Sequence, residues 1–324
     1  MTGLSPDDIH AAAKQLSGQI IHTPTLPAPA LSRLLGCNLF LKHEQLQHTS
    51  SFKARGAYLA ITALTDSQRA KGVITMSAGN HAQAVAYHAQ KLNVHATIVM
   101  PMQTPFAKVE RTRAFGAEIV FEGRNLNECE KTVAQLQKER GYSLIHPYDD
   151  AHVIRGQGTV GLEMLKEFPE VDTVIIPTSG GGLISGIAQA IKLQKPDTKV
   201  IAVSMERGPS MYESLKKGEP VDVDEIETLA DCLGGSIGLD NKFTFNIVKQ
   251  YVDDFVLVSE EKIAEGIRMN FMEHKIVSEG AAATSVMVVK DKLTSHLGKN
   301  IICLICGGNI DSELFNKVLS NAHP

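Results

Sequence analysis

Residues 171–183 read VDTVIIPTSGGGL, an apolar run that ends in a serine and three consecutive glycines. A stretch of helical length follows to about Gln194, and a second apolar run spans residues 199–205. Val and Ile crowd both runs without strict alternation, which is typical of strands that helices cover on both faces. The pattern predicts a strand, a small-residue turn, a helix and a second strand, the repeating unit of α/β folds.

The same unit occurs earlier in the chain. It predicts a strand over residues 72–76, a turn, a helix over 81–92 and a strand over 96–100. Strands that alternate with helices indicate parallel sheets covered by helices, so the two regions predict an α/β protein with two lobes. In such folds the loops at the carboxyl ends of the strands hold the ligand. The remaining pattern predicts helices over residues 108–115, 125–140 and 259–274, and strands over residues 118–121 and 300–306.

The composition narrows the class of function. The chain has 324 residues and a formal net charge of −4. This balance argues against nucleic acid or an anionic membrane surface as the partner, because either favours a basic patch. No apolar run approaches the roughly 20 residues of a membrane helix, and residues 1–10 lack the basic and apolar segments of a signal peptide. We expect a cytoplasmic protein that acts on a small metabolite.

The cysteines do not indicate a disulfide framework or a metal site. Their number is odd, and they are spread along the chain. Cys303 and Cys306 have the spacing of a metal-binding pair, but side chains three positions apart in a strand point to opposite faces. No second Cys or His pair completes a set of four ligands, so no metal is expected.

The strongest candidate for an anion site is the glycine loop, which consists of Ser179, Gly180, Gly181, Gly182 and Leu183. Three glycines let backbone N–H groups approach a phosphate at the N-terminus of the following helix. The loop is not a P-loop, because no Gly-Lys-Ser/Thr follows, and it lacks the Gly-x-Gly-x-x-Gly spacing of a dinucleotide fold. The alternative interpretation is a tight turn that needs small residues for structure alone.

Lys53 is the candidate nucleophile, within the stretch TSSFKARGA at residues 49–57. An amine that attacks a carbonyl group needs a lowered pKa, which burial and a nearby positive charge supply. We expect Arg55 to provide that charge. Taken in isolation, a lysine at the start of a helix is a solvated charge, so its meaning depends on which loops lie beside it.

A third loop also joins a strand to a helix and contains Ser77, Ala78, Gly79, Asn80 and His81. Backbone amides and the helix dipole at such a junction can hold a carboxylate. The side-chain amide of Asn80 can bond a ring hydroxyl or an oxyanion. The alternative is an asparagine that caps its helix beside a packed histidine.

Four motifs in this order resemble the serine/threonine dehydratase and serine racemase family: SFK at 51–53, SAGNHAQ at 77–83, SGGGL at 179–183 and CGGN at 306–309. The resemblance covers nearly the whole chain, and GQGT at 156–159 matches a further family stretch. Within the family, residues 204–208 and 233–241 are most similar to the branch associated with hydroxyectoine utilisation.

The resemblance implies a two-lobed α/β enzyme of the tryptophan-synthase-β fold, called fold type II, with pyridoxal 5′-phosphate as its cofactor. Residues 1–62 and 150–324 would form a large, cofactor-binding domain, and residues 63–149 a small domain. A homodimer is implied as well. The cofactor would lie in the cleft between the lobes.

The resemblance also implies roles for individual residues. Lys53 would form a Schiff base with the cofactor aldehyde and act as the catalytic residue. The other cofactor contacts would be made by Phe52, Asn80, Ser179, Gly180, Gly181, Gly182, Leu183 and Cys306. The substrate carboxylate would be held by Ser77, Ala78, Gly79, Asn80 and His81. Cys306 would face the pyridine nitrogen, and a neutral partner there makes a weaker electron sink than an Asp, which favours β-elimination.

The chain departs from the family pattern at several positions. Ala78 stands where the racemases carry a Ser that serves as the acid/base on the second face, so two-sided proton transfer loses one partner. Ser204 and Ser210 stand where cation-dependent members place acidic ligands, so no magnesium or calcium is expected. Cys232 replaces the Gly that usually follows Ala-Asp and bears on the identity of the substrate.

The expected activity is the pyridoxal-phosphate-dependent elimination of water from L-threonine or L-serine, which gives a 2-oxo acid and ammonia, as in amino-acid catabolism. Two enzymatic alternatives remain, a serine racemase and a dehydratase of a hydroxyectoine-derived or 3-hydroxyaspartate-like compound. A third alternative, a phosphate- or nucleotide-binding protein without activity, has only the glycine loop in its favour.

Overall fold

Six strands form the larger of two sheets in the computed structural model, which describes residues 5–124 and 126–320. Their order is β1-β2-β10-β7-β8-β9. Only β1 and β2 pair in antiparallel fashion, and the other neighbours are parallel. The bounds are β1 (Thr25–Pro27), β2 (Asn38–His43), β7 (Thr173–Pro177), β8 (Lys199–Met205), β9 (Asp254–Val258) and β10 (Asn300–Ile305).

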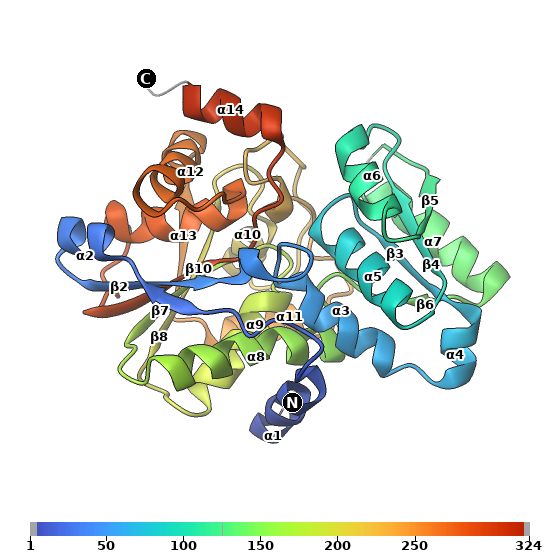
Figure 1. Ribbon diagram of the computed structural model, residues 1–324, viewed down its shortest axis with the longest axis horizontal. Coiled ribbons are helices and arrows are strands. Elements are labelled where there is room, and N and C mark those ends of the chain that lie inside the picture. Colours follow the sequence, from blue (N-terminus) through green and yellow to red (C-terminus); the bar gives the residue numbers. More distant parts are fainter. Residues whose placement is uncertain (1–4, 125, 321–324) are drawn as a thin grey trace.

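Four strands form the second sheet, in the order β5-β4-β3-β6, and all of its pairs are parallel. They are β3 (Val73–Met76), β4 (Ala96–Met100), β5 (Glu118–Phe121) and β6 (Ser143–Leu144). Figure 1 shows this sheet and its helices as a group of elements beside the larger sheet. The predicted α/β architecture with two parallel sheets covered by helices is therefore confirmed.

The helices connect the strands and cover the sheets. They are α1 (Pro6–Leu16), α2 (Pro29–Leu35), α3 (Lys53–Thr62), α4 (Asp66–Lys71), α5 (Asn80–Lys91), α6 (Phe106–Arg113), α7 (Leu126–Arg140), α8 (Ala151–Glu167), α9 (Gly182–Lys192), α10 (Ser210–Lys217), α11 (Thr244–Tyr251), α12 (Glu260–His274), α13 (Gly280–Lys290) and α14 (Ser312–Ser320), with short 3-10 helices η1 (Glu44–Leu46) and η2 (Asp231–Leu233). Within the described residues, no helix has the length and apolar character needed to cross a bilayer.

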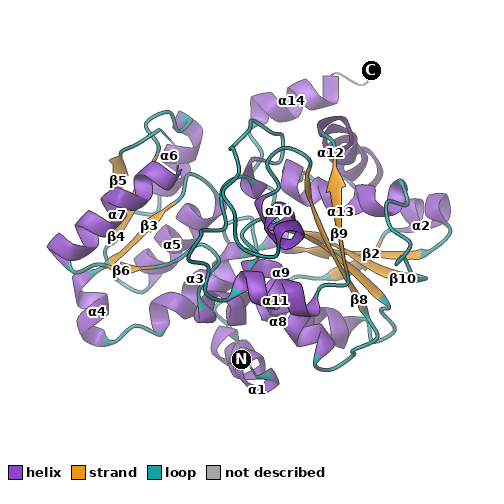
Figure 2. Ribbon diagram, turned by 180° about the vertical axis from the view of Figure 1, so that it is seen from behind, coloured by secondary structure: helices purple, strands orange, loops and turns teal. Residues whose placement is uncertain are grey.

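The core of the large lobe explains the unalternating strand sequences. Every residue of β7 is buried, because α9 contacts this strand while α13 packs against β7, β8 and β10. Helices lie on both sides of the large sheet in Figure 2. All residues from Gly280 to Val289 of α13 are buried, so this helix is a central layer of the core. A strand covered on both faces has no reason to alternate apolar with polar residues.

Several predicted elements differ at their ends, such as the helix predicted over residues 81–92, which is α5 (Asn80–Lys91). The helix predicted over residues 108–115 is α6, which begins after Pro105 and ends before Gly116, whose φ of +75° stops helical geometry. The strand predicted over 300–306 ends at Ile305. In the helix predicted over 125–140, Asn125 lies outside the described residues.

Candidate active site

The lysine segment and the CGGN segment lie side by side in the large lobe. Ser51 forms an isolated antiparallel bridge with Gly307. The N–H of Phe52 donates to the carbonyl of Cys306 at 3.2 Å, and the N–H of Gly308 donates to that of Ser50 at 2.9 Å. These backbone bonds join two parts of the chain that are more than 250 positions apart and set the start of α3.

Lys53 is the first residue of α3, and its amine points at the carbonyl of Pro147, to which it donates at 2.5 Å. The Nζ atom lies 5.3 Å from the centroid of the Phe52 ring, which packs against the large core. Burial of the amine lowers the pKa of Lys53 to about 8, although Cys232, Cys306 and Glu279 oppose that shift. An amine with this pKa is neutral far more often near physiological pH than an amine with the ordinary pKa of 10.5, and the neutral form is the nucleophile.

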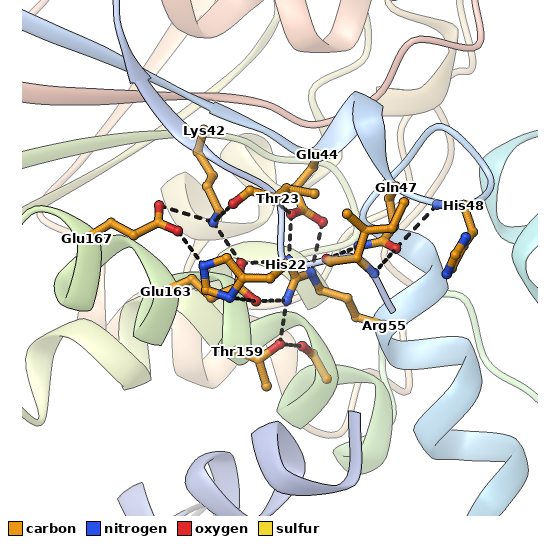
Figure 3. A network of polar contacts seen from close by, with 12 residues as sticks. His22, Thr23, Lys42, Glu44, Gln47, His48, Arg55, Thr159, Glu163 and Glu167 are labelled. Atoms are coloured by element: carbon orange, nitrogen blue, oxygen red, sulfur yellow. Dashed lines mark hydrogen bonds and ion pairs between the residues drawn. The ribbon is translucent and has the colours of Figure 1, made fainter. Parts of the chain in front are cut away.

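The expectation that Arg55 lowers the pKa of Lys53 is wrong. Arg55 is fully buried, and its guanidinium donates to Glu44, Glu163 and Thr159 (Figure 3). The two carboxylates neutralise its charge, and Arg55 is not among the groups that shift the pKa of Lys53. Arg55 instead fixes the first turn of α3 against η1 and α8.

The glycine loop connects β7 to α9, and its glycines are required by close neighbours. A Cβ atom on Gly180 would collide with the ring of Tyr148, and one on Gly182 would lie 2.8 Å from Tyr148 Cα. Gly181, the N-cap of α9, has a φ of +88°, which L side chains rarely adopt. The turn itself therefore needs glycine at these positions, but this need does not account for the free backbone donors of the loop.

In the described part of the chain, no acceptor is paired with the backbone N–H groups of Ser179, Gly180 and Gly181. The N–H groups of Gly182 and Leu183 belong to the first turn of α9, where helical geometry leaves them free. Consecutive free donors at the N-terminus of an 11-residue helix suit a phosphate group. The loop therefore fits the phosphate of the cofactor that the sequence motifs imply.

Tyr148 forms one wall of the glycine loop. Its hydroxyl donates to the carbonyl of Ser236 at 2.9 Å. The neighbouring Asp149 accepts three backbone N–H bonds, from residues 242–244, at 2.6 to 3.0 Å, and so caps the start of α11. These bonds hold the Tyr148 ring against the loop. The run Tyr-Asp-Asp carries no local signal for this role, because the partners are more than 80 positions away.

The Ser77–His81 loop joins β3 to α5. The hydroxyl of Ser77 accepts from the N–H of Gly79 at 3.2 Å. His81 is buried and donates from Nε2 to the carbonyl of Ile145 at 2.9 Å. Burial and the nearby Lys53 lower the pKa of His81 to about 3, so its ring is neutral. Its Nδ1 atom has no partner in the described residues, which leaves an acceptor within the site.

Asn80 contacts a residue that the motifs did not reveal. Its Nδ2 atom lies 2.9 and 3.0 Å from the two carboxylate oxygens of Glu279, and its Oδ1 accepts from Asn309 Nδ2 at 2.7 Å. Burial raises the pKa of Glu279 to about 7, although hydrogen bonds from Asn80 and Asn309 act to lower it. Sequence reasoning missed Glu279 because a single Glu before an apolar helix is typical of a capping charge.

Two cysteines also face this centre. Cys232 Sγ lies 3.5 Å from Asn80 Nδ2, and a Cβ atom built on Gly79 would lie 4.0 Å from the same sulfur. Cys306 Sγ lies 4.0 Å from Glu279 Oε1, and burial raises the pKa of its thiol, which therefore stays neutral. Cys303 points elsewhere, to the carbonyl of Ser285 at 3.4 Å.

Ser204 and Ser210, which stand where cation-dependent members of the family place acidic ligands, both form contacts within the protein. Ser204 Oγ contacts Met205 Sδ at 3.4 Å, and Ser210 Oγ donates to the carbonyl of Gly235 at 2.8 Å. Among the described residues, no group of three or more His, Cys, Asp or Glu side chains is arranged to hold a metal ion.

Known proteins are similar to this chain over nearly its whole length. The family model described as pyridoxal-phosphate dependent enzyme matches residues 16–307. The L-threonine ammonia-lyase of Thermotoga maritima is 42% identical over 97% of this chain and 78% of its own length. The catabolic L-threonine dehydratase of Staphylococcus aureus strain N315 is 41% identical over 98% of this chain and 92% of its own length.

A solved structure of maize serine racemase superposes with a TM-score of 0.92 at 33% identity and covers 98% of this chain and 97% of its own. The similarity to these proteins in both sequence and fold thus extends over nearly the full length of this chain. We conclude that the chain belongs to the serine/threonine dehydratase group of the pyridoxal-phosphate dependent enzymes, with fold type II and pyridoxal 5′-phosphate as its cofactor.

Proposed function

We propose that this enzyme is a dehydratase that eliminates water from a β-hydroxy amino acid, L-threonine or L-serine, and releases a 2-oxo acid and ammonia. The proposal rests on the Lys53 amine, because burial lowers the pKa of this amine to about 8. Relatives at about 40% identity that are named threonine ammonia-lyase or threonine dehydratase support the reaction type.

Different residues of the site would hold different parts of the cofactor. Lys53 would bind its aldehyde, residues 179–183 its phosphate, and Phe52 would lie against its ring. Asn80 would donate to the ring oxygen, and the Cys306 thiol would face the ring nitrogen. When bound, the cofactor supplies an electron sink for the negative charge that develops at the substrate Cα.

The chain itself would handle the substrate and its protons. The loop of Ser77, Ala78, Gly79, Asn80 and His81 would hold the substrate carboxylate through backbone N–H groups at the start of α5. The neutral Lys53 amine would then remove the proton from Cα. His81 is neutral, and its Nδ1 atom has no partner among the described residues, so it can accept a hydrogen bond there but cannot supply a positive charge.

Racemisation of serine is the second candidate, because the maize serine racemase has nearly the same fold. Ala78 argues against it, since a methyl group cannot transfer a proton on the face opposite Lys53. Cys232, which lies against Gly79 and Asn80, faces the proposed substrate side and could select a hydroxyectoine-derived or 3-hydroxyaspartate-like compound.

We also propose the division into a large domain of residues 1–62 and 150–324 and a small domain of residues 63–149. The separate sheets support it, since all strands of the smaller sheet lie between Val73 and Leu144. A homodimer in the cytoplasm is proposed from the family resemblance, and neither nucleic acid nor a membrane is a proposed partner.

The test measures 2-oxo acid release from L-serine, L-threonine, 3-hydroxyaspartate and hydroxyectoine by the purified protein. Lys53→Ala should abolish the visible absorbance of the bound cofactor and lower turnover by about 10² or more. Lys14→Ala, at an exposed position of α1, serves as the matched control. A colourless wild-type protein that binds nucleotides would instead indicate a binding protein.

A further inference from the structure

We infer that Glu279 is a positioning residue, whose buried carboxylate holds the Asn80 side chain so that one N–H of its amide is left for the cofactor. The inference rests on the proposed function, in which Asn80 contacts the cofactor ring oxygen. It concerns Glu279, which precedes α13 and lies 199 positions from Asn80 in the sequence.

The distances show how the amide donors of Asn80 are divided. Nδ2 lies at nearly equal distances, 2.9 and 3.0 Å, from the two oxygens of Glu279. A single N–H that points between the two oxygens accounts for both contacts. In the part of the chain that the structure describes, the other partner of Nδ2 is Cys232 Sγ at 3.5 Å. Sulfur is a weak acceptor, so the second N–H can turn to a ring oxygen at little cost.

The opposite end of the amide makes the orientation unique. Asn80 Oδ1 accepts from Asn309 Nδ2, which also donates to the carbonyl of Thr49 at 2.8 Å. If the Asn80 amide were turned over, its oxygen would face the carboxylate and its NH₂ group would face another NH₂ group. Both contacts would be repulsive, and buried polar groups would lose their partners. Glu279 and Asn309 therefore select one orientation.

The surroundings of Glu279 supply hydrogen-bond donors and space for its carboxyl group. The residue is 2% exposed and also accepts from the N–H of Asn309 at 3.3 Å. Its own N–H donates to the carbonyl of Gly307, and a Cβ atom at position 307 would collide with its carboxylate. Gly307, the first glycine of the CGGN motif, thus leaves room for the Glu279 side chain.

The same contact joins the two sheets across the site. Asn80 begins α5, which packs against β3 and β4 of the smaller sheet, whereas α13 packs against the larger sheet. A shift of one lobe would pull the amide away from the carboxylate. Glu279 therefore fixes Asn80 relative to Lys53 and Cys306, which belong to the large-lobe side.

The experiment compares Glu279→Gln with Glu261→Gln, an exposed position on α12 that serves as control. The first variant keeps the shape but replaces one of the two oxygens that accept from Asn80 by an NH₂ group and removes the negative charge. The loss of a charge-assisted hydrogen bond should weaken cofactor binding about tenfold. In an Asn80→Ala background, Glu279→Gln should cause no further loss, because Glu279 acts through Asn80. Additive losses, or an unchanged dissociation constant, would overturn the inference.

A second readout uses the protein without cofactor. The side-chain ¹⁵N–¹H signals of Asn80, identified by their disappearance in Asn80→Ala, should move in Glu279→Gln and stay in place in Glu261→Gln. Unmoved signals would refute the assignment even if the enzyme proved inactive. If the wild-type protein bound no cofactor but these signals moved, the proposed function would fail while the contact held. Glu279→Asp, which keeps the carboxylate on a shorter side chain, should give an intermediate shift.

Discussion

Replacing Arg55 by lysine should destabilise the protein strongly, although the charge is conserved. The guanidinium has five N–H donors, and all five are used. Nε donates to Glu44 at 2.9 Å, Nη1 to Thr159 and Glu163 at 3.0 and 2.6 Å, and Nη2 to Glu44 and Glu163 at 2.7 and 2.8 Å. Arg55 and Glu44 are both 0% exposed, so water cannot take over a lost bond.

The expected loss follows from the donor count. A lysine ammonium has three donors on one atom, so at least two of the five bonds are lost. At about 1.5 kcal/mol for each charge-assisted bond, the free energy of unfolding should fall by about 3 kcal/mol. Lys42, which donates to Glu163 at 2.7 Å, is already committed to the same network and cannot replace the guanidinium at Glu44 (Figure 3). Arg55→Met should cost more, because it leaves Glu44 buried without a cation.

The assay is urea unfolding followed by circular dichroism, with Arg124→Lys as the matched control. Arg124 also pairs with a glutamate, Glu128, but its side chain is 85% exposed, so its replacement should change stability by less than about 1 kcal/mol. If Arg55→Lys unfolds at the same urea concentration as Arg124→Lys, the buried network does not hold α3 in place, and the argument from donor count is wrong.

Three further predictions concern the site. Gly181→Asp should weaken cofactor binding by about 100-fold or more through charge repulsion. Gly181→Ala brings the same Cβ to within 2.7 Å of Met211 Cε, so it measures the steric strain alone. Equal losses of cofactor affinity in the two variants would show that the phosphate does not bind at this loop. Elimination should outpace racemisation, and Ala78→Ser should raise the share of D-isomer seen by chiral chromatography; a wild-type enzyme that forms D-isomer as fast as 2-oxo acid contradicts the assignment. Because burial lowers the pKa of Lys53 from 10.5 to about 8, the rate at which the cofactor-free protein takes up pyridoxal phosphate should rise with a midpoint near pH 8. The unfolded chain holds that proton up to pH 10.5, so stability should also rise with pH between 8 and 10.5; a midpoint near 10.5 would mean an exposed amine.

Local patterns were enough to predict the architecture, and they also supplied the candidate residues of the site. The strands over residues 96–100 and 199–205 match β4 and β8, because a strand buried on both faces leaves an apolar run. The strand over residues 118–121 matches β5, a less buried strand at the edge of its sheet. The glycine loop is a local signal as well, since the free backbone donors and the start of α9 lie within a few residues of each other. The periodicity of a strand or helix and the backbone freedom of a glycine depend on neighbouring residues, so both can be recognised in a short stretch of sequence.

Partners that meet across the fold were decided by the tertiary structure. Arg55 was expected to act on Lys53, two positions away, but its side chain faces Glu163, 108 positions away, because successive residues of a helix point in different directions. Glu279 and Asn80 come together only because α13 and α5 begin next to each other in the fold. A sequence pattern specifies which residues are buried in an element, whereas the packing of elements determines which buried groups touch and, through burial, where the pKa values of Lys53 and Glu279 lie.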